Sequence, residues 1–67
     1  MREEQNNKVG IADAYNNIAG LYEKQEAYDE AIKNYQNALV LYIEVNEKRK
    51  SSKVLHNIGY ALCQKTA

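Results

Sequence analysis

The apolar residues of this chain recur with the period of an α-helix. Tyr15, Ile18, Ala19 and Tyr22 follow one another at steps of three, one and three residues, which places them on one helical face. The same stepping continues through a second segment, at Tyr28, Ala31, Ile32, Tyr35, Ala38, Leu39 and Tyr42. The β-branched residues show no alternation of period two, so strands are not expected. The pattern therefore predicts an all-α fold.

One eight-residue segment occurs twice in related form. YNNIAGLY at residues 15–22 returns as LHNIGYAL at residues 55–62, forty positions later, where Leu55, Ile58, Gly59 and Leu62 repeat the first spacing. Self-similarity at a period of roughly 20–50 residues is typical of stacked-repeat proteins. We expect three helices, at about 7–24, 28–45 and 48–64. They would form an antiparallel helical hairpin and a third helix within one unit over residues 1–67.

The sizes of the residues on these faces predict how the helices pack. Small residues at Ala19, Ala31 and Gly59 would let the backbones approach closely. The wider gaps would be filled by aromatic side chains, namely Tyr15, Tyr22 and Tyr35.

The segment ALVLYI at residues 38–43 is apolar on every side, which a helix tolerates when it is buried on two sides. An aggregation-prone strand is the alternative, and the flanking Ala and Glu favour the helix.

The segment VNEKRKSS between the second and third helices contains neither Pro nor Gly. A turn near Asn46 is the favoured interpretation, with the third helix packed on its own hairpin. The alternative is a fused helix of about 35 residues, which would place the third segment on a neighbouring chain by domain swapping.

Composition narrows the class of protein. Nine basic and nine acidic residues give a net charge of zero, so the overall charge offers no case for nucleic acid or an anionic membrane. The single cysteine cannot form an internal disulfide, and no apolar run approaches eighteen residues. The segment MREEQNNK is polar and is not typical of a signal peptide. We therefore expect a soluble, cytoplasmic protein.

The spacing of the key residues resembles a tetratricopeptide repeat. That family's pattern is an aromatic residue, Leu-Gly and Tyr on one helix, then Ala, Phe and a closing Pro on the next. The matching residues here are Tyr15, Ile18, Ala19, Tyr22, Ala31 and Tyr35, and Ala38 suits the small residue that follows. The closing Pro is absent, and the period is forty rather than about 34 residues. The chain thus resembles about one and a half repeats of a longer variant, an αα-superhelix fragment whose extra residues fall in NEKRKSSK.

The resemblance implies a binding surface for a protein or an extended peptide along the first helices of the repeats. The residues expected to line it are Asp13, Asn16, Asn17, Gly20, Lys24, Lys53, His56, Asn57, Tyr60 and Gln64. Asn17 and Asn57 match a position where family members often hold a ligand's backbone with an amide, which donates and accepts hydrogen bonds. Alternatively, these amides bond to a neighbouring helix. A chaperone-tail clamp is disfavoured, because Asn16 and Gly20 stand where that subclass uses Lys and Asn.

The remaining residues indicate no catalytic chemistry. His56 has no second ligand at metal-binding spacing, and Cys63 has no base within helical reach. No catalytic triad or phosphate-binding loop is present, so we expect neither an enzyme nor a cofactor or metal. The basic cluster Lys48, Arg49, Lys50 and Lys53 is interpreted as a solvated turn in preference to a phosphate site.

Two functions from different classes remain open. The first is a protein- or peptide-binding module cut from a longer repeat array. The second is a self-associating structural unit, most simply a dimer, because a third helix without a following partner leaves apolar residues uncovered. The residues assigned to this self-association are Leu55, Ile58, Ala61 and Leu62.

Overall fold

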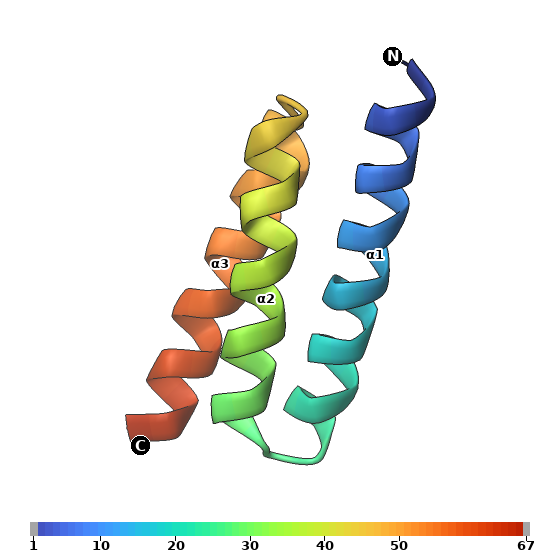
Figure 1. The fold of residues 1–67 in the computed structure, drawn as a ribbon. Helices are drawn as coiled ribbons and strands as arrows, with labels where there is room; N and C mark the ends of the chain where they lie inside the picture. The colour runs from blue at the N-terminus through green and yellow to red at the C-terminus, as the bar shows by residue number, and fades with distance from the viewer. Residues whose placement is uncertain (1, 67) are drawn as a thin grey trace.

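The chain folds into three helices joined by two tight turns. The computed structural model describes residues 2–66, in which α1 spans Arg2–Lys24, α2 spans Tyr28–Glu44 and α3 spans Lys48–Thr66. Helices α1 and α3 both pack on α2 and run in the opposite direction to it (Figure 1). The all-α hairpin with a third helix is confirmed. The strand alternative for residues 38–43 is wrong, because they lie within α2.

Two helices extend beyond their predicted ends. α1 begins at Arg2 rather than near residue 7, and α3 continues to Thr66 rather than ending near residue 64. The apolar stripe marks only the part of a helix that packs, whereas polar helix formers such as Glu, Gln and Lys extend it further. At the end of α3, the Thr66 hydroxyl donates to the carbonyls of Leu62 and Cys63, each at 3.1 Å.

Both turns have the same hydrogen-bonded geometry. Glu26 and Asn46 adopt left-handed backbone conformations, with φ of 63° and 61°. The next amide reaches back five residues in each turn, from Ala27 to the Tyr22 carbonyl at 2.9 Å and from Glu47 to the Tyr42 carbonyl at 2.8 Å. This is the Schellman pattern of helix termination. The turn predicted at Asn46 is confirmed, and the fused-helix alternative is wrong.

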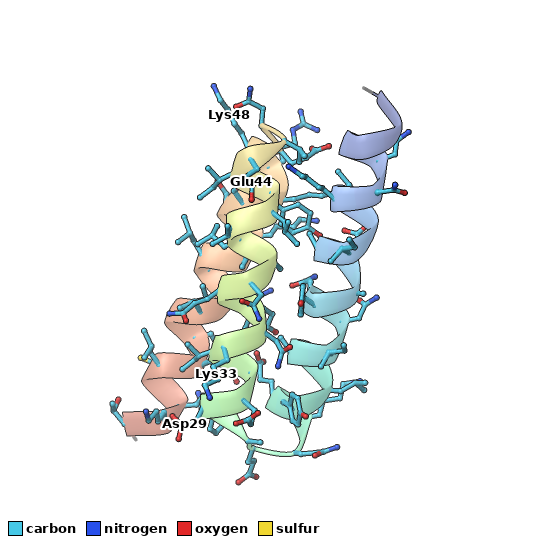
Figure 2. The ribbon with its side chains drawn as sticks, in the orientation of Figure 1. Asp29, Lys33, Glu44 and Lys48 are labelled. Atoms are coloured by element: carbon cyan, nitrogen blue, oxygen red, sulfur yellow. The ribbon has the colours of Figure 1, made fainter. Side chains whose placement is uncertain are left out.

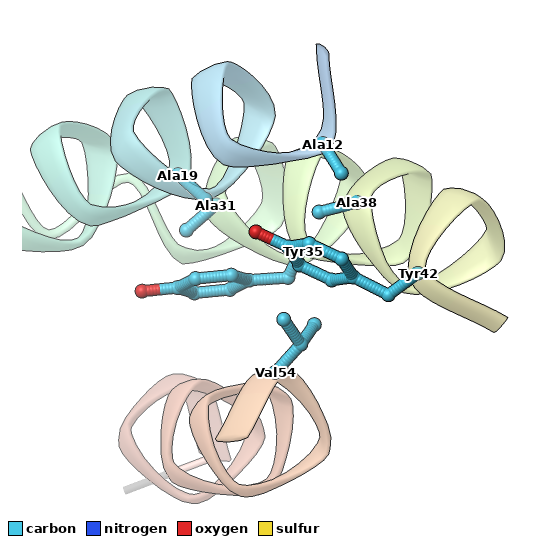
Figure 3. Packing of buried hydrophobic residues seen from close by; sticks show 7 residues of the cluster. All are labelled: Ala12, Ala19, Ala31, Tyr35, Ala38, Tyr42 and Val54. Carbon is cyan, nitrogen blue, oxygen red and sulfur yellow. The ribbon is translucent and has the colours of Figure 1, made fainter. Parts of the chain in front are cut away.

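The core is built on alanines where α1 meets α2 and on tyrosines where α2 meets α3. Ala12 lies against Ala38, and Ala19 lies against Ala31, which brings the two backbones close (Figure 3). The rings of Tyr35 and Tyr42 lie between this hairpin and Val54 of α3 (Figure 3). All of these residues are buried. The predicted roles of Ala19, Ala31 and Tyr35 are therefore confirmed.

Several residues assigned to the packed stripes are instead exposed. Ile18 is 41% exposed, and Gly59 has no neighbour within 4 Å of where a Cβ would stand. The buried residues of α3 are Val54 and Ala61, which flank the stripe expected from the sequence. In the segment 38–43, Val40 and Ile43 also remain exposed, so the expected two-sided burial is only partial. These predictions were wrong because periodicity marks every apolar face of a helix, and it does not show which of those faces has a neighbouring helix.

Exposed ion pairs connect the outer helices to the two ends of α2. Lys8 of α1 lies 3.0 Å from Glu44, and Lys65 of α3 lies 2.5 Å from Asp29. Asp29 and Glu44 lie at opposite ends of α2 (Figure 2). Asp29 and Glu30 also occupy the first turn of α2, as expected for negative charge at the positive end of the helix dipole.

Candidate functional site

The candidate site is a groove between the two outer helices, with α2 as its floor. Two hollows form it, and we call them together the α1–α3 groove. The small hollow, of about 140 Å³, is lined by Asp13, Asn16, Tyr42, Lys50, Lys53 and Val54. The large hollow, of about 450 Å³, is lined by Asn16, Asn17, Gly20, Leu21, Lys24, Tyr35 and Asn57. Because Asn16 lines both, the two hollows adjoin each other.

Two tyrosines of α2 cross the floor of the groove and bond to carboxylates of α1. The Tyr35 hydroxyl donates to Glu23 Oε1 at 2.9 Å, and the Tyr42 hydroxyl donates to Asp13 Oδ1. Burial, reinforced by the adjacent carboxylate, raises the pKa of Tyr35 to about 12. The same causes raise the pKa of Tyr42 well above its ordinary value. Both hydroxyls therefore stay protonated near neutral pH and fix the position of their carboxylates.

Lys50 lies over the same pair of residues at the small hollow. Its Nζ is 3.5 Å from Asp13 Oδ1 and 5.7 Å from the centroid of the Tyr42 ring. The ammonium group thus has a carboxylate and an aromatic face as partners. Asp13, Tyr42 and Lys50 link all three helices at this point.

Asn16 carries the least satisfied polar atom of the groove. Its Oδ1 is buried and accepts no hydrogen bond from any residue that the structure describes. A buried acceptor without a partner has a free-energy cost of about 1–3 kcal/mol. Because this oxygen has almost no exposed surface, a donor in either hollow would reach it only after the Asn16 side chain turned toward the groove.

The structure brings most of the predicted surface together. Seven of the ten residues line the two hollows, namely Asp13, Asn16, Asn17, Gly20, Lys24, Lys53 and Asn57. The other three, His56, Tyr60 and Gln64, are exposed and line neither hollow. They lie toward the solvent side of α3.

Six residues of this site are not predicted from the sequence, namely Leu21, Glu23, Tyr35, Tyr42, Lys50 and Val54. Tyr35 and Tyr42 were assigned to packing, although their hydroxyls reach the groove. The sequence predicts that Lys50 belongs to a solvated turn, and it predicts no role for Glu23. Within the basic cluster, Lys48 and Arg49 are exposed as expected, whereas Lys50 and Lys53 line the small hollow. The available signal was the seven-residue spacing of the two tyrosines, which places both rings on one face of α2.

The residues proposed for self-association divide between two environments. Ala61 is buried and Ile58 packs against the core, so both are used within the chain. Leu55 and Leu62 are 55% and 46% exposed. Only this second pair is available to a partner.

The described residues form neither a metal site nor a membrane-spanning helix. Among the described residues, no group of three or more His, Cys, Asp and Glu side chains is placed to hold a metal ion. Within residues 2–66, no helix combines the length and apolar character needed to cross a membrane. His56 and Cys63 both lie at the exposed surface of α3.

Comparison with known families gives a match that covers most of the chain. The tetratricopeptide repeat model matches residues 10–66. The chain belongs to the tetratricopeptide repeat family. In this family's terms, α1 and α2 form one repeat and α3 is the first helix of the next, which gives about one and a half repeats. Comparisons with curated proteins and with solved structures found no match.

Proposed function

We propose that this tetratricopeptide module binds a protein partner through an extended peptide segment held in the α1–α3 groove. The observation that supports it is a polar groove formed by two helices that occupy equivalent places in successive repeats. Modules of this family are generally associated with protein–protein interaction. Binding, rather than catalysis, is the role that such a surface suits.

Asn17 and Asn57 are the residues that we assign to the peptide backbone. They stand forty positions apart, at the same place in the repeated segment, and both line the large hollow. Each amide can donate one hydrogen bond to a carbonyl and accept one from an N–H group. Two amides facing one hollow can therefore hold an extended strand without selecting its side chains.

The test is selection from a random peptide library, followed by titration of a selected peptide against Asn17→Ala and Asn57→Ala. We expect each variant to lower affinity about tenfold, the equivalent of about 1.4 kcal/mol. The melting temperature should stay near that of the parent chain. A matched control is Asn37→Ala, which removes an exposed amide from α2. Equal losses of stability in the Asn17 and Asn57 variants would instead assign both amides to packing.

A second candidate function, self-association, is favoured by the apolar side chains left exposed on all three helices. On α1 these are Ile11, Ile18 and Leu21, and on α2 and α3 they are Val40, Ile43, Leu55 and Leu62. Isolated repeats leave such faces uncovered, and about three repeats are usually needed for stability. Another copy of the chain, or further repeats of a longer array, would cover them.

Sedimentation analysis over a range of concentrations tests this second candidate. Self-association is supported if the chain forms a dimer whose dissociation constant rises in Leu55→Ser and Leu62→Ser. Ile11→Ser and Leu21→Ser make the same kind of change on the exposed face of α1 and are measured alongside. A folded monomer at high micromolar concentration would rule out self-association and leave the peptide-binding role intact.

The cysteine content bears on where this binding takes place. One cysteine and no predicted disulfide suit the reducing cytoplasm, where we place the binding.

A further inference from the structure

We propose that the ligand of the α1–α3 groove is an acidic peptide segment, with two carboxylate side chains four residues apart. This inference rests on the proposed function and specifies its ligand. It follows from three features of the groove, namely the excess of lysines over carboxylates, the distance between two of those lysines, and the unpaired acceptor of Asn16.

The charge of the groove differs from that of the whole chain. The chain carries no net charge, yet the hollows are lined by Lys24, Lys50 and Lys53 against one carboxylate, Asp13. Glu23 borders the large hollow through its bond to Tyr35, and lysines still outnumber carboxylates when it is included. The exposed face of α2 has the opposite balance, because Asp29, Glu30 and Glu44 outnumber Lys33 there.

Two of the three groove lysines have no anionic partner among the described residues. Lys50 is paired with Asp13, whereas neither Lys24 nor Lys53 forms an ion pair with a described carboxylate. One lies at each hollow. The Tyr35 hydroxyl bonds to Glu23, and the Tyr42 hydroxyl bonds to Asp13, whose ion-pair partner is Lys50, so neither carboxylate pairs with Lys24 or Lys53. The groove therefore presents one unpaired cation at each end.

The spacing of these cations sets the spacing of the acidic residues. Lys53 lines the small hollow beside Asp13 and Asn16, and Lys24 lies eight to eleven residues further along α1. At 1.5 Å per helical residue, the backbone positions of the two lysines are therefore about 12–16 Å apart along the groove. An extended peptide rises about 3.3 Å per residue and alternates its side chains, so residues four apart span about 13 Å on one face.

Asn16 supplies the contact between these two cations. The residue lines both hollows, while its Oδ1 is buried and lacks a donor among the described residues. Rotation of the Asn16 side chain would turn this oxygen toward the groove, where a backbone N–H group between the two acidic residues would satisfy it. Recognition then combines two charge contacts with one backbone hydrogen bond, and the acidic side chains set the register.

The experiment uses blocked, fluorescein-labelled peptides of about ten residues in a Thr/Ser background, with two Glu residues separated by two, four or six positions. Fluorescence anisotropy measures their affinity for the full chain. We expect the four-residue spacing to bind at least about tenfold more tightly than the other two. Lys24→Glu and Lys53→Glu should each weaken that binding about tenfold or more, while Lys33→Glu on α2 makes the same charge change outside the groove and should have little effect.

Two further variants separate recognition from bulk charge and from folding. The double variant with Glu at both lysine positions should prefer a peptide with two Lys residues at the same spacing. Asn16→Leu removes the unsatisfied acceptor, so it should weaken binding while the melting temperature stays equal or rises. A lower melting temperature for Asn16→Leu would assign Asn16 to packing and overturn its role here.

The remaining outcomes separate this inference from the proposed function. Affinity that ignores Glu spacing, or that falls equally with Lys33→Glu, would show charge attraction without a register and overturn the acidic-pair inference. Library-selected peptides that need Asn17 and Asn57 but carry no acidic residues would overturn it too, and would leave the peptide-binding role standing. If neither the selected nor the acidic peptides bind, both proposals fail.

Discussion

Helices α1 and α3 occupy equivalent places in successive repeats, yet they are buried on different faces. On α1, the face of Ala12, Tyr15, Ala19 and Tyr22 packs against α2. The residues forty positions later on α3 include Leu55, Gly59 and Leu62, and these are exposed. α3 instead packs through Val54 and Ala61, whose counterparts on α1 are the exposed Ala14 and Leu21.

The difference shows that one repeated helix has two packing faces, one for the helix before it and one for the helix after it. Among the described residues, α1 packs on the helix that follows it and α3 on the helix that precedes it, so each leaves its other face open. The repeat equivalence also indicates what the open face of α3 would fit. The corresponding face of α1 packs against α2, so the face of Leu55, Gly59 and Leu62 would fit a helix with a surface like that of α2.

The largest effect is expected where the covered face of α1 meets α2. Ala31 is fully buried beside Ala19, so Ala31→Leu should overpack the hairpin and destabilise it by about 1–3 kcal/mol. Ala14→Leu makes the same substitution on the open face of α1 and should change stability by less than about 0.5 kcal/mol. Circular dichroism melts compare the two. Equal stabilities would mean that the assigned tetratricopeptide register is wrong.

A smaller effect is expected from the tyrosine hydroxyls that join α2 to α1. Tyr42→Phe removes the donor to Asp13 and should lower stability by about 1 kcal/mol at neutral pH. Tyr35→Phe removes the donor to Glu23 and should act in the same direction. Tyr60→Phe, which removes an exposed hydroxyl, is the control. If all three variants melt alike, these hydrogen bonds contribute little to the packing of α2 against α1.

The raised pKa values of these tyrosines also predict a pH dependence. An acid whose pKa folding raises contributes its stabilisation fully below its unfolded pKa of about 10. For Tyr35, that contribution is lost as the pH rises from about 10 towards about 12. Melting temperature should therefore fall over this range, and less steeply in Tyr35→Phe. Near-ultraviolet absorbance of tyrosinate follows the same titration, and an identical alkaline decline in parent and variant would contradict the assignment.

The sequence predicted the helices well because packing and periodicity share one cause. The stripes of Tyr15, Ala19, Ala31 and Tyr35 are apolar or small where they pack, so spacing alone locates them. Asn46 also marked the second turn, because Asn tolerates the left-handed backbone that helix termination uses. Glu26 adopts that conformation as well, and its residue type gave no comparable signal.

The candidate site was predicted only in part, because it depends on contacts between helices. Periodicity placed Asn17 and Asn57 on matching faces, and both do line the large hollow. It did not show that the Tyr42 hydroxyl would reach Asp13, because that contact depends on how far the Tyr42 ring extends from α2 into the space between α1 and α3. Nor did it indicate which face of α3 lacks cover, since that depends on a neighbour and not on the helix itself.

The open face of α3 predicts a modest gain of stability. Gly59 lies inside a helix with no neighbour near its missing Cβ, so Gly59→Ala should stabilise the monomer by about 0.5–1 kcal/mol through helix propensity. Ala19→Gly, the reverse change at the equivalent covered position, should destabilise by more than that, because packing against α2 is also lost. Gly10→Ala makes the same substitution at a second glycine that has no neighbour within 4 Å of its missing Cβ, and it serves as a control. A loss of stability in Gly59→Ala would indicate that this face is covered in solution, as self-association requires.

The smallest effect is expected from the ion pairs at the two ends of α2. Lys8–Glu44 ties α1 to α2, and Lys65–Asp29 ties α3 to α2, with both pairs largely exposed to solvent. Such pairs contribute about 0.2–1 kcal/mol, because water screens the attraction and ordering two long side chains opposes it. Lys8→Gln and Lys65→Gln should therefore each lower stability by less than about 1 kcal/mol, and the difference from the parent should shrink as salt is added. Denaturation in urea measures these differences in the free energy of unfolding. Urea is uncharged, so it does not itself screen the ion pairs. If Lys65→Gln destabilised the chain far more than Lys8→Gln at low salt, and this excess disappeared as salt was added, α3 would depend on its ion pair more than on Val54 and Ala61. The two outer helices would then differ in how much an ion pair stabilises their contact with α2, as well as in how they pack on it.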